Sequence, residues 1–186
     1  MARRRRLDAP GLVSHVTARG VDGCPIFCSA ADRRGYLALL EDAVERFDWR
    51  VYAYCLMRNH VHLLIETTWP NLSRGLQRLN GIHAQRFNRR HGRSGHLFQG
   101  RFGSEPVERD SHLLSTARYV VLNPVRAGLC REPADWPWSS YRATAGAANA
   151  GFLALERLLP FFGPDEERAR RRYCTYVRDG VGARAA

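Results

Sequence analysis

Hydrophobic and polar positions follow two repeating patterns along most of the chain. β-Branched residues and partial apolar–polar alternation predict strands at residues 11–18, 49–57, 60–67 and 96–107. Apolar residues at every third or fourth position predict helices at residues 31–47, 72–90 and 110–122. We expect a bulge at Gly100 in the fourth strand. The third helix should end before Pro124, because a residue that precedes proline avoids the α region.

The order of these elements predicts the fold class. Strand, helix, strand, strand, helix, strand is the split βαβ, ferredoxin-like arrangement of an α+β protein with an antiparallel sheet, and a tyrosine-bearing helix is added to it. The aromatic segment at residues 135–141 should pack back on the core. We divide the chain into a flexible basic arm (1–10), one folded domain (11–145), and a linker with a helical C-terminal extension (146–186).

Charge adds an expected partner. The chain of 186 residues has a formal net charge of +11, and all 29 of its basic residues are arginine. Guanidinium groups pair with phosphate oxygens and stack on bases, so nucleic acid is the expected partner. No apolar run approaches the roughly 20 residues that span a bilayer, and the N-terminus has no secretory apolar region, which predicts a cytoplasmic protein without membrane contact. Five scattered cysteines argue against a disulfide framework.

Two histidines, His60 and His62, stand two positions apart in the predicted third strand. Alternate side chains of a strand point to opposite faces, so both imidazoles should project from one face. Two neutral imidazoles on a rigid strand form half of a divalent-metal site. Asn123 or Glu66 could supply a third ligand, which would leave open positions for phosphate and water. Alternatively, the histidines only cap the core or face solvent.

Tyr119 and Asn123 are one turn apart on the same face of a predicted helix. An ordinary tyrosine, with a pKa of about 10, attacks phosphorus only if its phenolate is stabilised or its proton is removed. A metal ion on the phosphate lowers that demand, so the histidines and the tyrosine together suggest phosphodiester cleavage by a tyrosine nucleophile. The alternative is that Tyr119 is a core aromatic of an amphipathic helix.

Several segments of the chain resemble a known family. They are residues 54–64, which contain the histidine–hydrophobe–histidine triplet, and residues 95–102, 118–129 and 136–141. In this order they resemble the REP-associated tyrosine transposases, which are single-tyrosine relatives of the IS200-type transposases in the HUH endonuclease superfamily. The resemblance covers roughly residues 8–145 and implies that residues 11–145 form the HUH catalytic domain.

The resemblance implies a mechanism. His60 and His62 would hold Mg²⁺ or Mn²⁺ on single-stranded DNA, with Asn123 as the third ligand where IS200-type relatives carry a glutamine. Tyr119 would attack the phosphate and leave a 5′-phosphotyrosine and a free 3′-hydroxyl, and a second 3′-hydroxyl would rejoin the strand. Family members act on short palindromic repeats that fold into hairpins, as monomers or homodimers.

Arginines are the expected DNA contacts. The candidates for phosphate binding are Arg3, Arg4, Arg5, Arg6, Arg74, Arg78 and Arg101. Two other functions remain open. The chain could be a non-catalytic DNA- or RNA-binding module on the same scaffold, or a metal phosphodiesterase that uses water.

Overall fold

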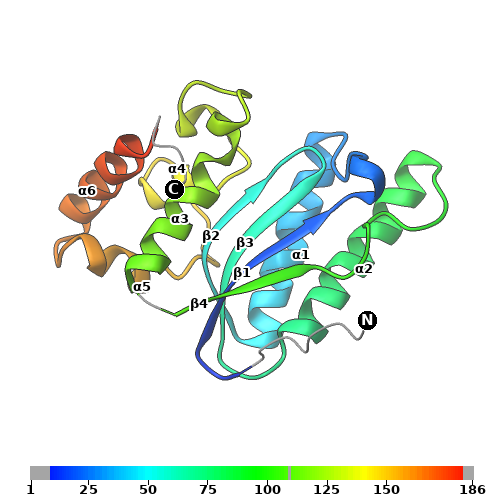
Figure 1. Cartoon of the computed structure of the whole chain (residues 1–186), viewed down its shortest axis with the longest axis horizontal. Coiled ribbons are helices and arrows are strands. Elements are labelled where there is room, and N and C mark those ends of the chain that lie inside the picture. Colours follow the sequence, from blue (N-terminus) through cyan, green and yellow to red (C-terminus); the bar gives the residue numbers. More distant parts are fainter. Residues whose placement is uncertain (1–8, 109, 182–186) are drawn as a thin grey trace.

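A four-stranded antiparallel sheet with the strand order β2-β3-β1-β4 organises the molecule (Figure 1). The strands are β1 (Leu12–Arg19), β2 (Trp49–Leu56), β3 (His60–Thr67) and β4 (Gly103–Val107). The computed structural model describes residues 9–108 and 110–181. Its mixed helix-and-sheet fold confirms the predicted α+β, ferredoxin-like class.

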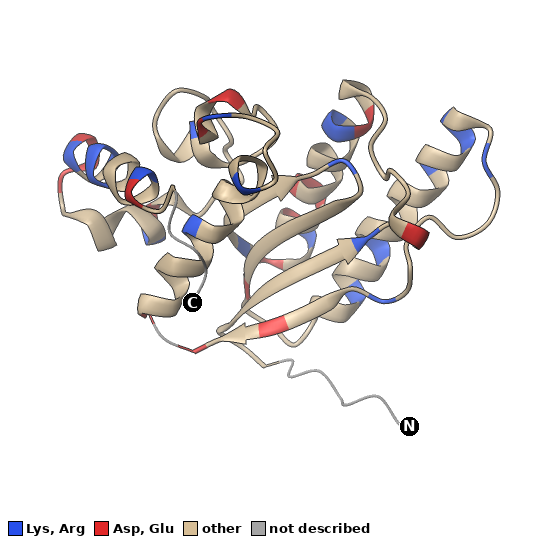
Figure 2. Cartoon of the chain, turned by 45° about the horizontal axis from the view of Figure 1, so that its top comes forward, with Lys and Arg blue, Asp and Glu red and all other residues tan. Residues whose placement is uncertain are grey.

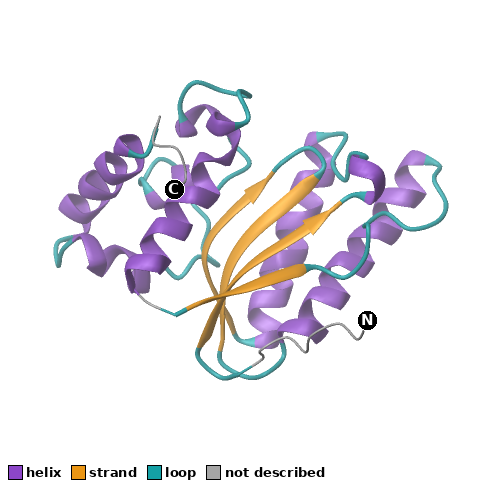
Figure 3. Cartoon of the chain, viewed as in Figure 1, coloured by secondary structure: helices purple, strands orange, loops and turns teal. Residues whose placement is uncertain are grey.

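Two long helices, α1 (Ala30–Phe47) and α2 (Leu72–His91), cover one face of the sheet. Other helices cover the opposite face, so the strands lie between two layers of helices (Figure 3). Strand alternation sends Val61, Leu63 and Ile65 into the core beneath them, and all three are fully buried. This is the face that the alternation predicted for the apolar residues between and after the two histidines.

Helix α1 begins at a reciprocal cap. The Ser29 hydroxyl accepts a hydrogen bond from the Asp32 backbone N–H, and the Asp32 carboxylate accepts one from the Ser29 N–H (2.9 Å). The same buried carboxylate is bound by Arg90 and His91 from the end of α2. One aspartate therefore ties the start of α1 to the end of α2.

The opposite face of the sheet carries α3 (Asp110–Arg126) and the C-terminal helices. These are α4 (Tyr141–Thr144), α5 (Leu155–Leu158) and α6 (Glu166–Asp179), and short 3-10 helices lie at Val21–Gly23, Pro133–Asp135 and Leu159–Phe162. Val120, Tyr173 and Val177 form a second core with side chains on the face of β2 and β3 that lies beneath α3. The predicted helical C-terminal extension is thereby confirmed. No helix within residues 9–108 and 110–181 is long and apolar enough to cross a membrane.

Residues 136–141 pack back on the sheet, as expected, along the outer edge of β2. Leu56 donates its backbone N–H to the Trp138 carbonyl (2.8 Å), and the Ser140 N–H bonds to the Tyr54 carbonyl (3.0 Å). Further along the same edge, the Ala154 N–H bonds to the Val51 carbonyl (2.9 Å). These backbone groups of Val51, Tyr54 and Leu56 are thus bonded within the chain.

Two predicted boundaries are wrong. The fourth strand is Gly103–Val107 rather than residues 96–107, because Leu97 and Phe102 enter the same core, whereas alternation would send them to opposite faces of a strand. The expected bulge at Gly100 therefore lies outside any strand.

The tyrosine-bearing helix does not end before Pro124 but continues through it to Arg126. The chain turns away from the helix just after Arg126, at Gly128, which takes a left-handed conformation (φ +68°). The Leu129 N–H donates a hydrogen bond to the Pro124 carbonyl (2.9 Å) and so caps the end of the helix. Proline removes one donor from the helix, and the packing of α3 on the sheet outweighs that loss.

Candidate functional site

Three histidines meet on the sheet face beneath α3. His60 and His62 come from β3, and their ring centroids are 4.9 Å apart. His15 comes from β1 and lies edge to edge with His62, with a centroid distance of 5.2 Å and an interplanar angle of 14°. Sequence reasoning missed His15, although it lies in a predicted strand, because only the pairing of β1 with β3 brings it beside His62.

Tyr119 reaches this cluster from α3. Its ring centroid lies 5.8 Å from that of His62 and 5.8 Å from that of His15, edge-on to both. The structure therefore brings together the predicted metal histidines and the predicted nucleophile, which are 57 or more positions apart in the chain. Tyr119 is only half-buried, so its ring remains partly open to solvent.

Hydrogen bonds orient the two imidazoles of β3. Asn59 donates its amide N–H to the Gly23 carbonyl (3.0 Å), which turns its Oδ1 towards His60 Nδ1 at 2.7 Å. An amide oxygen only accepts, so the hydrogen of His60 resides on Nδ1 and its Nε2 carries a lone pair. His62 Nδ1 is in turn bonded to His15 Nε2 at 2.9 Å, so its Nε2 is also the nitrogen turned to other partners.

The surroundings keep these imidazoles neutral. Burial first, and then the neighbouring His15 and His60, lower the pKa of His62 from 6.5 to about 3. Burial, together with the nearby Arg19 guanidinium, also lowers the pKa of His60. Neutral imidazole is the form that binds metal ions, so the donor set fits a divalent cation.

The two candidates for a third ligand stand in different settings. Asn123 donates its amide N–H to the Tyr119 backbone carbonyl (2.9 Å), which leaves Oδ1 as the atom able to bind a cation. Glu66 is instead engaged by the Arg50 guanidinium and the Tyr52 hydroxyl and is nearly buried. Within residues 9–108 and 110–181, no three His, Cys, Asp or Glu side chains are grouped to hold a metal ion. The hydrogen bonds therefore engage both carboxylate oxygens of Glu66, whereas the bond of the Asn123 amide uses its N–H and not its oxygen.

A cation that sequence reasoning also missed lies over the tyrosine. The guanidinium carbon of Arg126 is 5.0 Å from the centroid of the Tyr119 ring. Its side chain is exposed, so the positive charge faces both the ring and the solvent. A phosphate that approaches the phenolic oxygen would meet this guanidinium.

Two of the predicted DNA contacts, Arg74 and Arg78, lie away from the tyrosine. Arg3 to Arg6 lie outside the described residues. Arg74 and Arg78 are exposed on α2, which covers the other face of the sheet, and Arg78 is 3.5 Å from the Asp42 carboxylate. Figure 2 shows arginines spread over several helices and the adjoining loops.

Arg101 lines a groove of about 980 Å³ between α2 and residues 95–102. Its walls carry uncharged amides, among them Gln77, Gln85 and Gln99, and Phe98 contributes apolar surface. The positive charge and the amides give this groove the chemistry of a nucleic-acid contact.

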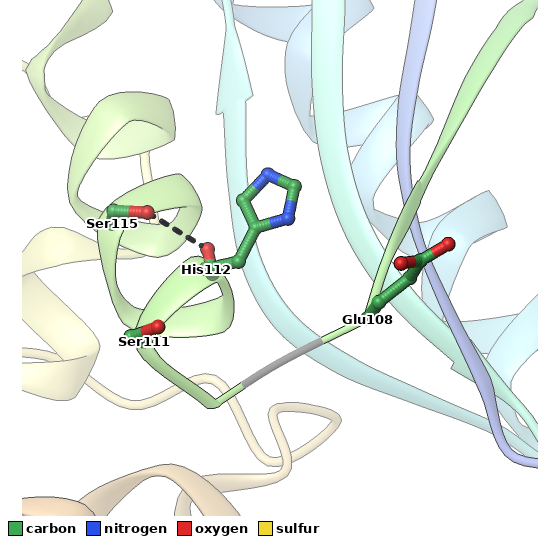
Figure 4. A pocket seen from close by; sticks show the side chains of 4 residues that line it. All are labelled: Glu108, Ser111, His112 and Ser115. Carbon is green, nitrogen blue, oxygen red and sulfur yellow. Dashed lines mark hydrogen bonds between the residues drawn. The ribbon is translucent and has the colours of Figure 1, made fainter.

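A smaller polar hollow of about 460 Å³ opens at the start of α3. Its walls are Glu108, Ser111, His112 and Ser115, and Figure 4 shows the His112 imidazole projecting from α3 towards the sheet. The Ser115 hydroxyl donates to the His112 backbone carbonyl (3.0 Å), so the imidazole itself takes no part in that bond.

Fold and site together define a protein whose antiparallel sheet presents a histidine pair to a tyrosine on a covering helix. The family model described as "Transposase IS200 like" matches residues 25–123, just over half of the chain. The chain therefore belongs to the IS200-like transposase family.

Individual proteins are also similar to it. A Haemophilus influenzae protein assigned as a REP-associated tyrosine transposase is 26% identical over 108 residues, which is 52% of this chain and 61% of that protein. The match thus spans about three fifths of the relative. A solved structure of a REP-associated tyrosine transposase bound to a REP hairpin superposes with a TM-score of 0.66 at 14% identity. It covers 82% of this chain and 96% of its own, a likeness that shows the fold.

Proposed function

We propose that the protein is a REP-associated tyrosine transposase, a divalent-metal-dependent endonuclease and strand transferase that acts on hairpin-forming repeats in single-stranded DNA. One observation carries the proposal. The Tyr119 ring stands edge-on over His62 in a cluster that also contains His60. Membership of the IS200-like family and the hairpin-bound structural neighbour support the choice of substrate.

The residues that would hold the metal are His60 and His62 through Nε2 and Asn123 through Oδ1. Mg²⁺ or Mn²⁺ would act there as a Lewis acid that polarises the scissile phosphate. The protein contributes two neutral, oriented imidazoles and an amide, and it leaves open the remaining positions that a phosphate and water require.

In each half of the proposed reaction, one bond to phosphorus forms as another breaks. The Tyr119 oxygen forms a bond to phosphorus, the bond from phosphorus to the 3′-oxygen breaks, and that oxygen leaves as a hydroxyl after taking a proton. The phenolic proton passes to solvent. In the second half, another 3′-hydroxyl attacks the phosphotyrosine and releases Tyr119, so no external energy source is needed.

Arg126 would bind the non-bridging oxygens of the same phosphate. Its guanidinium already lies beside the Tyr119 ring, so it requires no large movement to reach a phosphate attached to the phenolic oxygen. The net charge of +11 would draw the DNA strand to the protein before this contact forms.

The test is covalent trapping. The full chain is incubated with labelled hairpin DNA, with and without Mn²⁺, and protein–DNA adducts are counted after denaturation. We expect a metal-dependent adduct that Tyr119→Phe abolishes. Tyr176→Phe is the matched control, since Tyr176 is also half-buried and also has an arginine, Arg118, over its ring (4.3 Å).

Other outcomes would contradict the proposal. Tight hairpin binding by the wild-type protein without any adduct would indicate a DNA- or RNA-binding module. Cleavage that persists in Tyr119→Phe, again without an adduct, would indicate that water is the nucleophile.

A further inference from the structure

We propose that His15 is a positioning residue that fixes the tautomer and the orientation of His62, so that His62 presents a lone pair on Nε2 to the metal. This inference rests on the proposed function, since it concerns the same metal site. It assigns a role to a β1 side chain that is not among the candidate ligands or the nucleophile.

The strand register places His15 where it can do this. In the antiparallel pairing of β1 and β3, His15 lies opposite Leu64, and Thr17 lies opposite His62. His15 and His62 are therefore diagonal neighbours on one sheet face. Their rings are nearly parallel, at an interplanar angle of 14°, and lie edge to edge, and the Nε2 to Nδ1 distance of 2.9 Å is that of a hydrogen bond.

The direction of this hydrogen bond decides whether His62 can bind a cation through Nε2. If His62 Nδ1–H donates to His15 Nε2, the lone pair of His62 lies on Nε2. If His15 donates instead, neutral His62 carries its hydrogen on Nε2 and cannot bind a metal there. The first arrangement matches that of His60, whose Nδ1 faces the Asn59 oxygen.

The neighbours of His15 favour the first arrangement. When His15 accepts at Nε2, its own hydrogen lies on Nδ1. Glu105 is the residue opposite His15 in the pairing of β1 with β4, and strand alternation puts both side chains on the same face. Its carboxylate provides a negative field beside His15, which favours a hydrogen on the ring nitrogen that is not bonded to His62.

His15 also touches the nucleophile, since its ring meets Tyr119 edge-on at 5.8 Å and 78°. A change at His15 could therefore alter activity through the tyrosine as well as through the metal. The decisive measurement is accordingly Mn²⁺ affinity of the full chain without DNA, measured by electron paramagnetic resonance titration.

Two substitutions separate the hydrogen bond from the packing. His15→Phe keeps a planar ring of similar size but has no nitrogen, and we expect it to weaken Mn²⁺ binding by about 10- to 100-fold, as loss of a partner of a metal ligand does. His15→Gln retains an accepting oxygen and should restore affinity to within a few-fold of wild type. His96→Phe, the same change at an exposed histidine of the loop after α2, is the control and should bind as wild type does.

A second measurement uses the wild-type protein and so does not depend on a variant that folds. Long-range ¹H–¹⁵N spectra of the histidine side chains report which ring nitrogen bears hydrogen. We expect His62 to be the Nδ1–H tautomer. A hydrogen on His62 Nε2, or a His15→Phe variant with wild-type Mn²⁺ affinity, would overturn the inference and leave the proposed function standing. Failure of the wild-type protein to bind Mn²⁺ would overturn both.

Discussion

Two glycines of α2 offer a direct test of how tightly this helix packs on the sheet. An ideal Cβ at Gly75 would lie 2.1 Å from Cζ2 and 2.5 Å from Cη2 of Trp49, and 3.1 Å from Cδ2 of Phe47. At Gly81, on the same helix, an added Cβ meets no heavy atom within 4 Å. The substitutions Gly75→Ala and Gly81→Ala are therefore chemically identical but sterically opposite.

The magnitudes follow from these distances. Alanine in place of glycine within a helix stabilises the fold by about 0.5–1 kcal/mol, which is the whole effect expected at Gly81. At Gly75 the indole must move by roughly 1.5 Å to reach the usual carbon–carbon separation of about 3.5–4.0 Å. Trp49 is buried and its Nε1–H bonds to the Asn71 oxygen (2.7 Å), so the movement is resisted. Overpacking of this kind costs about 1–3 kcal/mol.

The assay is urea unfolding followed by far-UV circular dichroism. We expect the free energy of unfolding to rise slightly in Gly81→Ala and to fall in Gly75→Ala, with a gap of about 1–3 kcal/mol between the two variants, because the gain in helix propensity is common to both. Two variants that agree within about 0.5 kcal/mol would refute the claim that Trp49 and Gly75 are in tight contact.

Three further predictions concern charged groups. Arg126→Gln should slow adduct formation by Tyr119 at least about tenfold, because the guanidinium next to the ring would no longer bind the phosphate. Arg101→Gln should weaken hairpin binding across sequences and lower the salt slope by about one unit. Asp32→Asn should cost about 1–3 kcal/mol at neutral pH. Although burial alone would raise the pKa of Asp32, hydrogen bonds, first among them that from Arg90, hold it well below its usual 3.8. The stabilisation is thus present above pH 3.8 and is lost as the pH falls below it, so acid should destabilise the wild type more steeply than the variant.

Each of these predictions has an outcome that contradicts it. Adduct formation at the wild-type rate would remove Arg126 from the reaction. An unchanged salt slope would remove Arg101 from the DNA footprint, with Arg171→Gln on the exposed side of α6 as the matched substitution. Parallel acid-unfolding profiles of wild type and Asp32→Asn would show that the carboxylate is not held ionised by the fold.

Local patterns were sufficient for most of the fold. The strand that carries His60 and His62 was predicted to the residue, because the short connection at Arg58 and Asn59 fixes where it begins. The fourth strand was overextended, because residues 96–102 contain apolar side chains that bury themselves from a loop rather than by alternation. The conformation of such a loop depends on contacts with other elements, and a regular spacing of apolar residues in the sequence does not indicate these contacts.

In the candidate site, too, local patterns predicted some of the residues, and the others depend on contacts that the sequence does not show. Alternation and helical spacing indicated the histidine pair and Tyr119, but His15 required knowledge that β1 pairs with β3. Arg126 was overlooked because the helix was expected to stop before Pro124, two residues ahead of it. Glu66 shares the face of the histidines, as alternation predicts, yet side chains from β2 engage it. The positions of His15 and Glu66 depend on contacts between distant segments, and that of Arg126 depends on the continuation of α3 through the proline.

The coverage of β2 by residues 136–141 has a consequence for self-association. A bare sheet edge can recruit a strand from another molecule, but here that side is occupied by the chain itself. The opposite boundary, β4, is only five residues long and contains Pro106, which offers no N–H to an incoming strand. If two copies of this protein associate, we expect them to do so through helices or loops, and not by joining their sheets into one continuous ribbon.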